Sequence, residues 1–336
     1  MRRRATIFAL VATAVLLGGA ALFGWQLHRP GPPLTAPVTV RVAQGERLAD
    51  VARQLVERGL LRSARPLLLW ARLTGRDRDI RTGDFRIAAA LSPVELLERL
   101  AGAPDALQVV TIPEGLTVRE VAARLSKAGL GPEDAFLALL ADPSFLASEG
   151  LPREGAEGYL FPDTYSFEAA TPPDRILRTM IHHFRDVFTA DMTAQAARVG
   201  LDGHQAVTLA SLVEEETARP DERPLVAAVF VNRLRKGIPL QADPTVLYGR
   251  DNGDRRIRRS DLARPTPHNT YTTKGLPPTP ISNPGRAALE AACAPADVPY
   301  LYFVARGDGS HEFNVELGAH NQAVARLRSL ERARHQ

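Results

Sequence analysis

Residues 110–131 read VTIPEGLTVREVAARLSKAGLG, and residues 40–61 read VRVAQGERLADVARQLVERGLL. The two stretches are copies of one pattern, and the same turn glycine recurs in both, as Gly45 and Gly115. Each copy predicts a short alternating strand, a glycine turn and an amphipathic helix that ends at another glycine. The repeat therefore predicts two small α/β units in the first half of the chain.

Around the first copy, residues 38–101 predict a compact β-α-α-β-α unit. Residues 63–73 have a helical pattern and residues 83–87 a strand pattern. The string SPVE, which begins at Ser92, opens a further helix with a cap, a proline at the first helical position and a reciprocal glutamate. Thr117 opens the helix of the second copy with a capping box. In pattern, the first unit resembles the LysM class of glycan-binding modules; a plain α/β packing module is the alternative.

The amino terminus predicts a membrane anchor. Residues 5–27 contain no charged side chain, and residues 2–4 before them are all arginine. At 1.5 Å per residue such a helix covers the ~30 Å hydrocarbon core, and positive residues stay cytoplasmic. We expect a single-pass inner-membrane protein with a cytoplasmic N-terminus and a periplasmic body; a cleaved signal peptide is the alternative. Residues 29–37 (RPGPPLTAP) predict a stiff spacer.

Composition excludes several classes of protein. The chain has 336 residues, of which 45% are hydrophobic and 24% charged, so it is not a disordered chain. A lone cysteine, Cys293, permits neither an internal disulfide nor a multi-thiolate metal site. A net charge of +4 and an aromatic content of 6% argue against a nucleic-acid partner. The eight histidines show no metal-ligand spacing, so we expect no metal and no cofactor.

Residues 204–217 (HQAVTLASLVEEET) predict a helix that carries carboxylates. Its apolar stripe runs through Leu209, and Glu216 falls within about 20° of that residue on the helix. Glu214 and Glu215 fall about 140° and 120° away, toward solvent or a flank. Glu216 is therefore the acid expected to be desolvated, which raises the pKa of a carboxyl and suits a general acid.

A second helix over residues 225–236 follows, with Asp221 as its predicted N-cap. The next segment, residues 239–248 (PLQADPTVLY), is predicted to be extended because prolines flank it. Its alternating polar side chains share one predicted face: these are Gln241, Asp243 and Thr245. Amide, carboxylate and hydroxyl groups together suit the hydroxyl and acetamido groups of a sugar. A polar strand edge is the alternative.

Residues 210–249 (ASLVEEETARPDERPLVAAVFVNRLRKGIPLQADPTVLYG) resemble the centre of the YceG-like (MltG) endolytic murein transglycosylases. The resemblance continues in residues 157–167 (EGYLFPDTYSF), 269–285 (NTYTTKGLPPTPISNPG) and 300–321 (YLYFVARGDGSHEFNVELGAHN). Four motifs in the right order cover nearly the whole chain, and the family also has a membrane anchor and a LysM-like region.

The resemblance implies an α+β chain: a membrane-anchored, LysM-like β-α-α-β module followed by a mixed α/β catalytic domain. The expected parts are residues 1–28 as cytoplasmic tip and transmembrane anchor, 29–37 as spacer, 38–106 as LysM-like module, 107–150 as second repeat-like segment and 151–336 as catalytic transglycosylase domain.

In the family a glutamate of a Glu-x-Glu-Thr string is catalytic, which implies Glu216 here. Glu215 stands where a lysine is common, and a third carboxylate would raise the pKa values of its neighbours. Glu214 remains the alternative acid. The expected substrate-binding residues are Glu214, Thr217, Gln241, Asp243, Thr245, Asn269, Tyr271, Asn314, His320 and Asn321.

The implied reaction cleaves the MurNAc-GlcNAc β-1,4 bond of peptidoglycan, leaves a 1,6-anhydroMurNAc end and terminates nascent glycan strands. The implied partners are glycan strands, the inner membrane and peptidoglycan synthases. Two other functions remain open. One is a non-catalytic peptidoglycan-binding scaffold, and the other is a water-using muramidase with a second acid such as Asp243.

Overall fold

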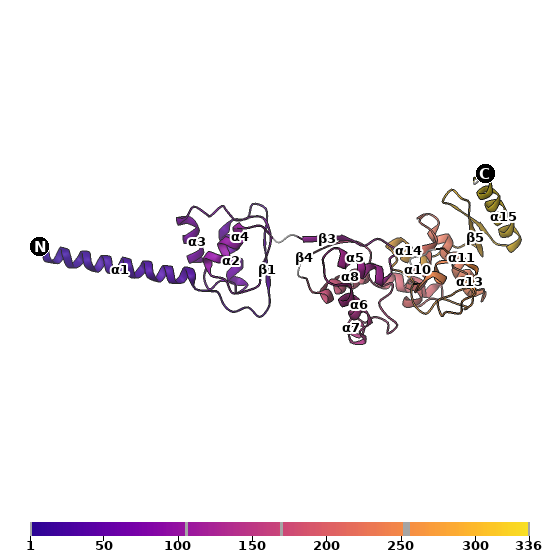
Figure 1. Cartoon of the computed structure of the whole chain (residues 1–336), viewed down its shortest axis with the longest axis horizontal. Coiled ribbons are helices and arrows are strands. Elements are labelled where there is room, and N and C mark those ends of the chain that lie inside the picture. The colour runs from indigo at the N-terminus through magenta and orange to yellow at the C-terminus, as the bar shows by residue number, and fades with distance from the viewer. Residues whose placement is uncertain (1, 105–106, 169–170, 251–255, 335–336) are drawn as a thin grey trace. The chain divides into compact units, whose positions relative to one another are not determined.

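The computed structural model describes residues 2–104, 107–168, 171–250 and 256–334 (Figure 1). The chain divides into two compact units, Met1–Leu107 and Gln108–Gln336. The described part is an α+β structure with many helices and three separate two-stranded sheets.

The first unit confirms the predicted β-α-α-β-α order. Its elements are α1 (Arg2–His28), β1 (Val38–Val42), α2 (Leu48–Glu57), α3 (Ala64–Leu73), β2 (Gly83–Ile87) and α4 (Pro93–Ala101). Strands β1 and β2 pair antiparallel, with Val40 opposite Phe85, and both side chains are fully buried in the unit's core. The capping box predicted at Ser92 is present, with the Ser92 hydroxyl and Glu95 closing it reciprocally.

Among the residues whose side chains are described, no helix combines the length and apolar character that a membrane crossing requires. The side chains of residues 1–9 and 12 lie outside that set. The predicted anchor over residues 5–27 falls partly on them.

The second unit holds most of the chain. Its elements are β3 (Leu107–Thr111), α5 (Val118–Lys127), α6 (Glu133–Ala141), α7 (Pro143–Ser148), β4 (Thr164–Glu168), α8 (Pro173–Val187), α9 (Ala190–Arg198), α10 (Gly203–Glu216), α11 (Arg223–Arg235), α12 (Pro244–Leu247), α13 (Arg259–Leu262), α14 (Arg286–Cys293), β5 (Tyr302–Ala305), β6 (His311–Asn314) and α15 (Leu317–Arg334). The sheets are β3-β4 and β5-β6. Buried side chains from residues 110–146 and 156–181 form one core. A second core joins α10, α11 and α14 (Figure 1).

Helix α10 begins with a capping box between Asp202 and Gln205, and α14 packs along it. The helix predicted to follow is present as α11, but the prediction that Asp221 caps it is wrong. The Asp221 carboxylate instead pairs with the Arg219 guanidinium at 2.9 Å, and Glu222 occupies the N-cap position without a side-chain cap bond.

The prediction of an extended segment over residues 239–248 is also wrong. Gln241 takes a left-handed backbone conformation, with φ of 52°, and Pro244 opens the short helix α12. Proline suits the first helical position as well as an extended chain, so its presence favoured the wrong local structure. Because the chain turns here, Gln241 and Asp243 are exposed while Thr245 is buried, and the three do not share one face.

Candidate active site

The three consecutive glutamates, Glu214 to Glu216, lie in the last turn of helix α10. Thr217 ends the helix with an extended backbone, φ −146° and ψ 129°. Glu214, Glu215 and Glu216 therefore lie at the negative end of the helix macrodipole, where carboxylates are unfavourable. Local helix stability gives no reason for this placement.

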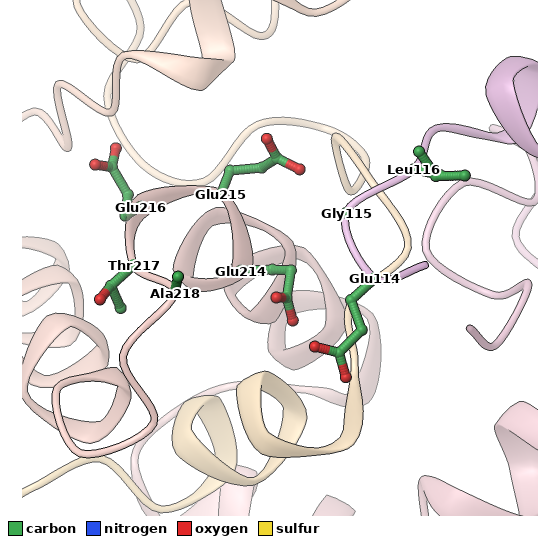
Figure 2. Close-up of a pocket in the computed structure, with 8 residues that line it drawn as sticks. All are labelled: Glu114, Gly115, Leu116, Glu214, Glu215, Glu216, Thr217 and Ala218. Carbon is green, nitrogen blue, oxygen red and sulfur yellow. The ribbon is translucent and has the colours of Figure 1, made fainter. Parts of the chain in front are cut away.

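An open pocket of about 340 Å³ lies at this end of α10 (Figure 2). One wall consists of residues 214–218, and the other is the turn at residues 114–116. Sequence reasoning missed this turn, although it belongs to the second repeat copy. The difference between the copies was a signal, because Glu114 stands where the first copy has Gln44.

Glu214 is a buried, paired carboxylate. Its side chain is 7% exposed, and it accepts hydrogen bonds from Arg223 Nη2 at 2.7 Å and from the Gly285 backbone N–H at 3.0 Å. Burial raises the pKa of Glu214 above its usual value, and the Glu114 carboxylate acts in the same direction, while the Gly285 N–H and the Arg223 guanidinium oppose this rise. Of the two predicted directions for Glu214, the flank is therefore confirmed and solvent is wrong. The helical wheel could not show that the first residue of α11 and the N-cap of α14 cover this flank.

Glu216 has different surroundings. Figure 2 shows its carboxyl directed away from those of Glu214 and Glu114. Burial is the main cause that raises the pKa of Glu216 to about 8, and the carboxylates of Asp243 and Glu215 act in the same direction. The Asp243 backbone N–H and the Arg233 guanidinium oppose this rise. The predicted desolvation of Glu216 is confirmed, and at neutral pH this carboxyl is mostly protonated.

Three polar residues lie near the Glu216 carboxyl. The Tyr271 hydroxyl donates to Asp243 Oδ1 at 2.5 Å. Arg233 is buried, and its guanidinium donates to the carbonyls of Leu301 and Leu240, both at 2.7 Å. The site thus combines a protonated acid, an exposed carboxylate and a buried cation.

Asn283 fixes the turn that forms the opposite wall. It is fully buried, and its Nδ2 and backbone N–H both donate to the Leu116 carbonyl, at 2.7 and 2.9 Å. The Gly115 N–H donates back to the Asn283 carbonyl at 2.9 Å. Two residues later, Gly285 holds Glu214, so one loop connects both walls. The family resemblance includes this loop, but the sequence alone predicts no role for Asn283.

Three of the expected substrate-binding residues are buried in the scaffold. Thr217 Oγ1 accepts the Arg219 N–H at 3.1 Å. Thr245 Oγ1 donates to the Ala242 carbonyl at 2.6 Å. The Asn269 amide is occupied by three backbone carbonyls, those of Asp261, Leu262 and Arg264. These groups shape the loops around the pocket.

The C-terminal residues that were expected to bind substrate have different surroundings. His320 stacks on Tyr302, with ring centroids 5.3 Å apart. Within the described residues, His320 Nδ1 and Asn314 Nδ2 are buried without a hydrogen-bond partner. Asn321 is exposed. Unpaired buried polar atoms are costly unless a ligand or water satisfies them. The same described ranges contain no group of three His, Cys, Asp or Glu side chains suited to a metal ion.

Comparisons with known proteins cover most of the chain. A family model described as the YceG-like family matches residues 40–326. A Bacillus subtilis (strain 168) protein named endolytic murein transglycosylase is 29% identical over 329 residues, which are 92% of this chain and 90% of that protein. A protein of the same name from Streptococcus pneumoniae serotype 2 (strain D39 / NCTC 7466) is 29% identical over 339 residues, 90% of this chain and 61% of that protein. A crystal structure of a yceG-like protein from Listeria monocytogenes has a TM-score of 0.59 and 29% identity, covering 85% of this chain and 98% of that one.

Proposed function

The chain belongs to the YceG-like family, and from this we propose that it is an endolytic murein transglycosylase that cleaves the MurNAc-GlcNAc β-1,4 bond of peptidoglycan. Two relatives carry that name. The observation that carries the proposal is Glu216, a carboxyl with a pKa raised to about 8 in a pocket-lining position.

Glu216 serves both halves of the reaction. Protonated at neutral pH, it donates its proton to the glycosidic oxygen as the bond from that oxygen to the muramoyl C1 breaks. The resulting carboxylate then takes the proton of the muramoyl C6 hydroxyl, whose oxygen forms a bond to C1. The proton returns to Glu216, and no water is consumed. The C6 hydroxyl is already in the same sugar, so its effective concentration near C1 is high.

The surrounding groups support this cycle. Arg223 and the Gly285 N–H occupy the two carboxyl oxygens of Glu214, so Glu214 is poorly placed to donate a proton to the glycosidic oxygen. We assign Glu214 to shaping the pocket beside the sugar. The unpaired Asn314 Nδ2 and His320 Nδ1 supply polar atoms for substrate. The exposed Gln241, Asp243 and Asn321 and the half-buried Tyr271 add further sugar-binding groups. Glycan strands are the substrate, and terminating nascent strands is the outcome.

The test is the chemical nature of the new glycan end. Purified chain is incubated with peptidoglycan sacculi, and the products are identified by mass spectrometry. We expect 1,6-anhydroMurNAc ends. Reducing MurNAc ends would instead favour a water-using muramidase in which Asp243, beside Glu216, activates water. Release of neither end would favour a non-catalytic scaffold.

We also propose that α1 anchors the chain in the inner membrane as a single span, with its N-terminus cytoplasmic and the catalytic unit periplasmic. The support is the uncharged run over residues 5–27, the arginines before it, and the continuity of α1 over Arg2–His28. A reporter fused after Gln336 should be active only if it functions in the periplasm. Activity of a cytoplasmic reporter there would contradict the orientation.

The first unit is proposed to be a LysM-like glycan-binding module. Its support is the β-α-α-β order with the antiparallel pair of β1 and β2. Peptidoglycan synthases are the proposed protein partners, because a strand-terminating enzyme acts where strands are made.

A further inference from the structure

We infer that Glu114 is a substrate-binding residue and that the turn at residues 114–116 forms the second wall of the glycan cleft. The inference rests on the proposed function, because the ligand is the saccharide that Glu216 cleaves. Glu114 lies outside the four motifs that carry the family resemblance, and it comes from the repeat copy that precedes them.

The turn is packed tightly against α10. Gly115 has φ of 80°, and a Cβ there would lie 2.8 Å from Glu215 Oε1. A Cβ on Gly285 would collide with the Glu114 carboxyl. Glycines at both positions therefore allow the turn to approach the acidic string and the start of α14. Together with the Asn283 hydrogen bonds, this packing fixes where the Glu114 side chain lies.

Glu114 is not required to neutralise the buried cation beside it. Its Oε2 lies 3.5 Å from Arg223 Nη2, whereas Glu214 Oε1 lies 2.7 Å from the same atom. The Glu114 side chain is 46% exposed, and an exposed ion pair contributes little to stability. Its carboxylate thus keeps lone pairs that can accept hydrogen bonds from a ligand.

The position of Glu114 relative to Glu216 indicates what it binds. The two side chains line one pocket from its two walls, and Figure 2 shows their carboxyls directed to different sides of it. A strand that presents a glycosidic oxygen to Glu216 brings a neighbouring sugar toward the turn. Sugar hydroxyls and acetamido N–H groups are the donors that a fixed carboxylate accepts. In addition, Arg223 Nε, on the guanidinium that contacts both Glu114 and Glu214, is buried without a partner among the described residues.

The experiment compares Glu114→Gln and Glu114→Ala with the unsubstituted full-length chain on soluble glycan strands, and anhydromuramoyl ends are counted by mass spectrometry. We expect KM to rise about tenfold for Glu114→Gln, because a hydrogen bond to an ionised acceptor is roughly twice as strong as one to a neutral acceptor. KM should rise further for Glu114→Ala, while kcat stays within about twofold because the contact is remote from the reacting atoms. Glu290→Gln, which removes an exposed acid on α14, is the matched control and should leave KM unchanged.

The possible results separate a failure of the Glu114 inference from a failure of the proposed function. Unchanged KM in both Glu114 variants, with an active unsubstituted chain, overturns the inference. The inference is also overturned if the Glu114 variants unfold at a lower temperature and their kcat falls by as large a factor as their KM rises. That result would show that Glu114 has a structural role. If the unsubstituted chain releases no anhydromuramoyl ends, it is the proposed function that fails.

Discussion

Arg223 Nη2 lies 2.7 Å from Glu214 Oε1, and this ion pair distinguishes two acids of a single helical turn. The Arg223 guanidinium and the Gly285 backbone N–H donate hydrogen bonds to Glu214 and favour its ionised form. Glu216, two residues later, is desolvated beside the carboxylates of Asp243 and Glu215. One helix end therefore holds an ion-paired acid and a desolvated acid two residues apart.

Glu216→Gln should abolish catalysis without weakening the fold. Glutamine keeps the volume and the hydrogen-bonding capacity of the side chain but cannot donate and recover a proton. Activity should fall by at least ~10²–10⁴-fold, the usual contribution of general acid–base catalysis. The thermal unfolding midpoint should not fall, because removing a desolvated acid relieves a cost. Release of anhydromuramoyl products from sacculi measures the first effect and calorimetry the second.

Glu215→Gln is the control for that variant and should retain most activity, because it leaves the Glu216 carboxyl in place. Near-normal release by Glu216→Gln, together with loss in Glu214→Gln, would show that Glu214 is the acid.

Glu214→Gln should act mainly on stability. The substitution leaves the buried Arg223 guanidinium without its nearer charged partner, and breaking a buried ion pair typically costs roughly 3 kcal/mol or more. Chemical denaturation should therefore show a lower free energy of unfolding, with part of the activity retained by the folded fraction. Unchanged stability would mean that Glu114 alone satisfies Arg223.

Activity should decrease as the pH rises through about 8, because the pKa of Glu216 is raised to about 8 and its protonated form starts the reaction. The contribution of Glu216 to the stability of the fold changes with pH in the same direction. Between pH about 4.5 and about 8 the folded chain holds a proton on Glu216 that the unfolded chain has lost. Stability from this group is thus complete at low pH and is lost as the pH rises through the folded pKa. The kcat/KM profile and the pH dependence of the free energy of unfolding measure the two effects.

Glu157 separates these two pH effects. It is 5% exposed, its pKa is also raised to about 8 by burial, and it accepts hydrogen bonds from the Val118 N–H and the Tyr248 hydroxyl. Because Glu157 is not among the pocket-lining residues, Glu157→Gln should reduce the pH dependence of stability but leave the descending limb of activity in place. A limb that disappears in Glu157→Gln would contradict its assignment to Glu216.

Deleting residues 38–101 should weaken binding to sacculi and spare the chemistry. The deleted unit has its own core, and the pocket lies wholly in the second unit. Co-sedimentation with sacculi measures binding, and the release of anhydromuramoyl ends measures chemistry. Equal binding by the full and the shortened chain would remove the LysM-like role.

Local signals predicted local structure well. Capping boxes at Ser92 and Thr117 are read from residues three apart, and both form. The desolvation of the half-buried Glu216 followed from its position on the same helical stripe as Leu209. Periodicity and capping depend on neighbours along the chain, so a single sequence carries them.

Contacts between distant segments were not predictable in this way. The partners of Glu214 come from the starts of α11 and α14, and Glu114 enters the pocket from the turn that precedes α5. The turn at Gln241 depends on its backbone N–H bonding to the Thr270 carbonyl at 3.2 Å, which no local pattern reveals. The extended reading of residues 239–248 failed for that reason.

The shared core of residues 110–146 and 156–181 determines where this chain can be shortened. A fragment that starts at residue 151 would keep every acid of α10, yet it would expose Met180 and Ile181, both fully buried in the intact unit. It would also lack Glu114 and the turn beside it. The smallest fragment expected to fold and to retain an intact cleft therefore begins near Gln108.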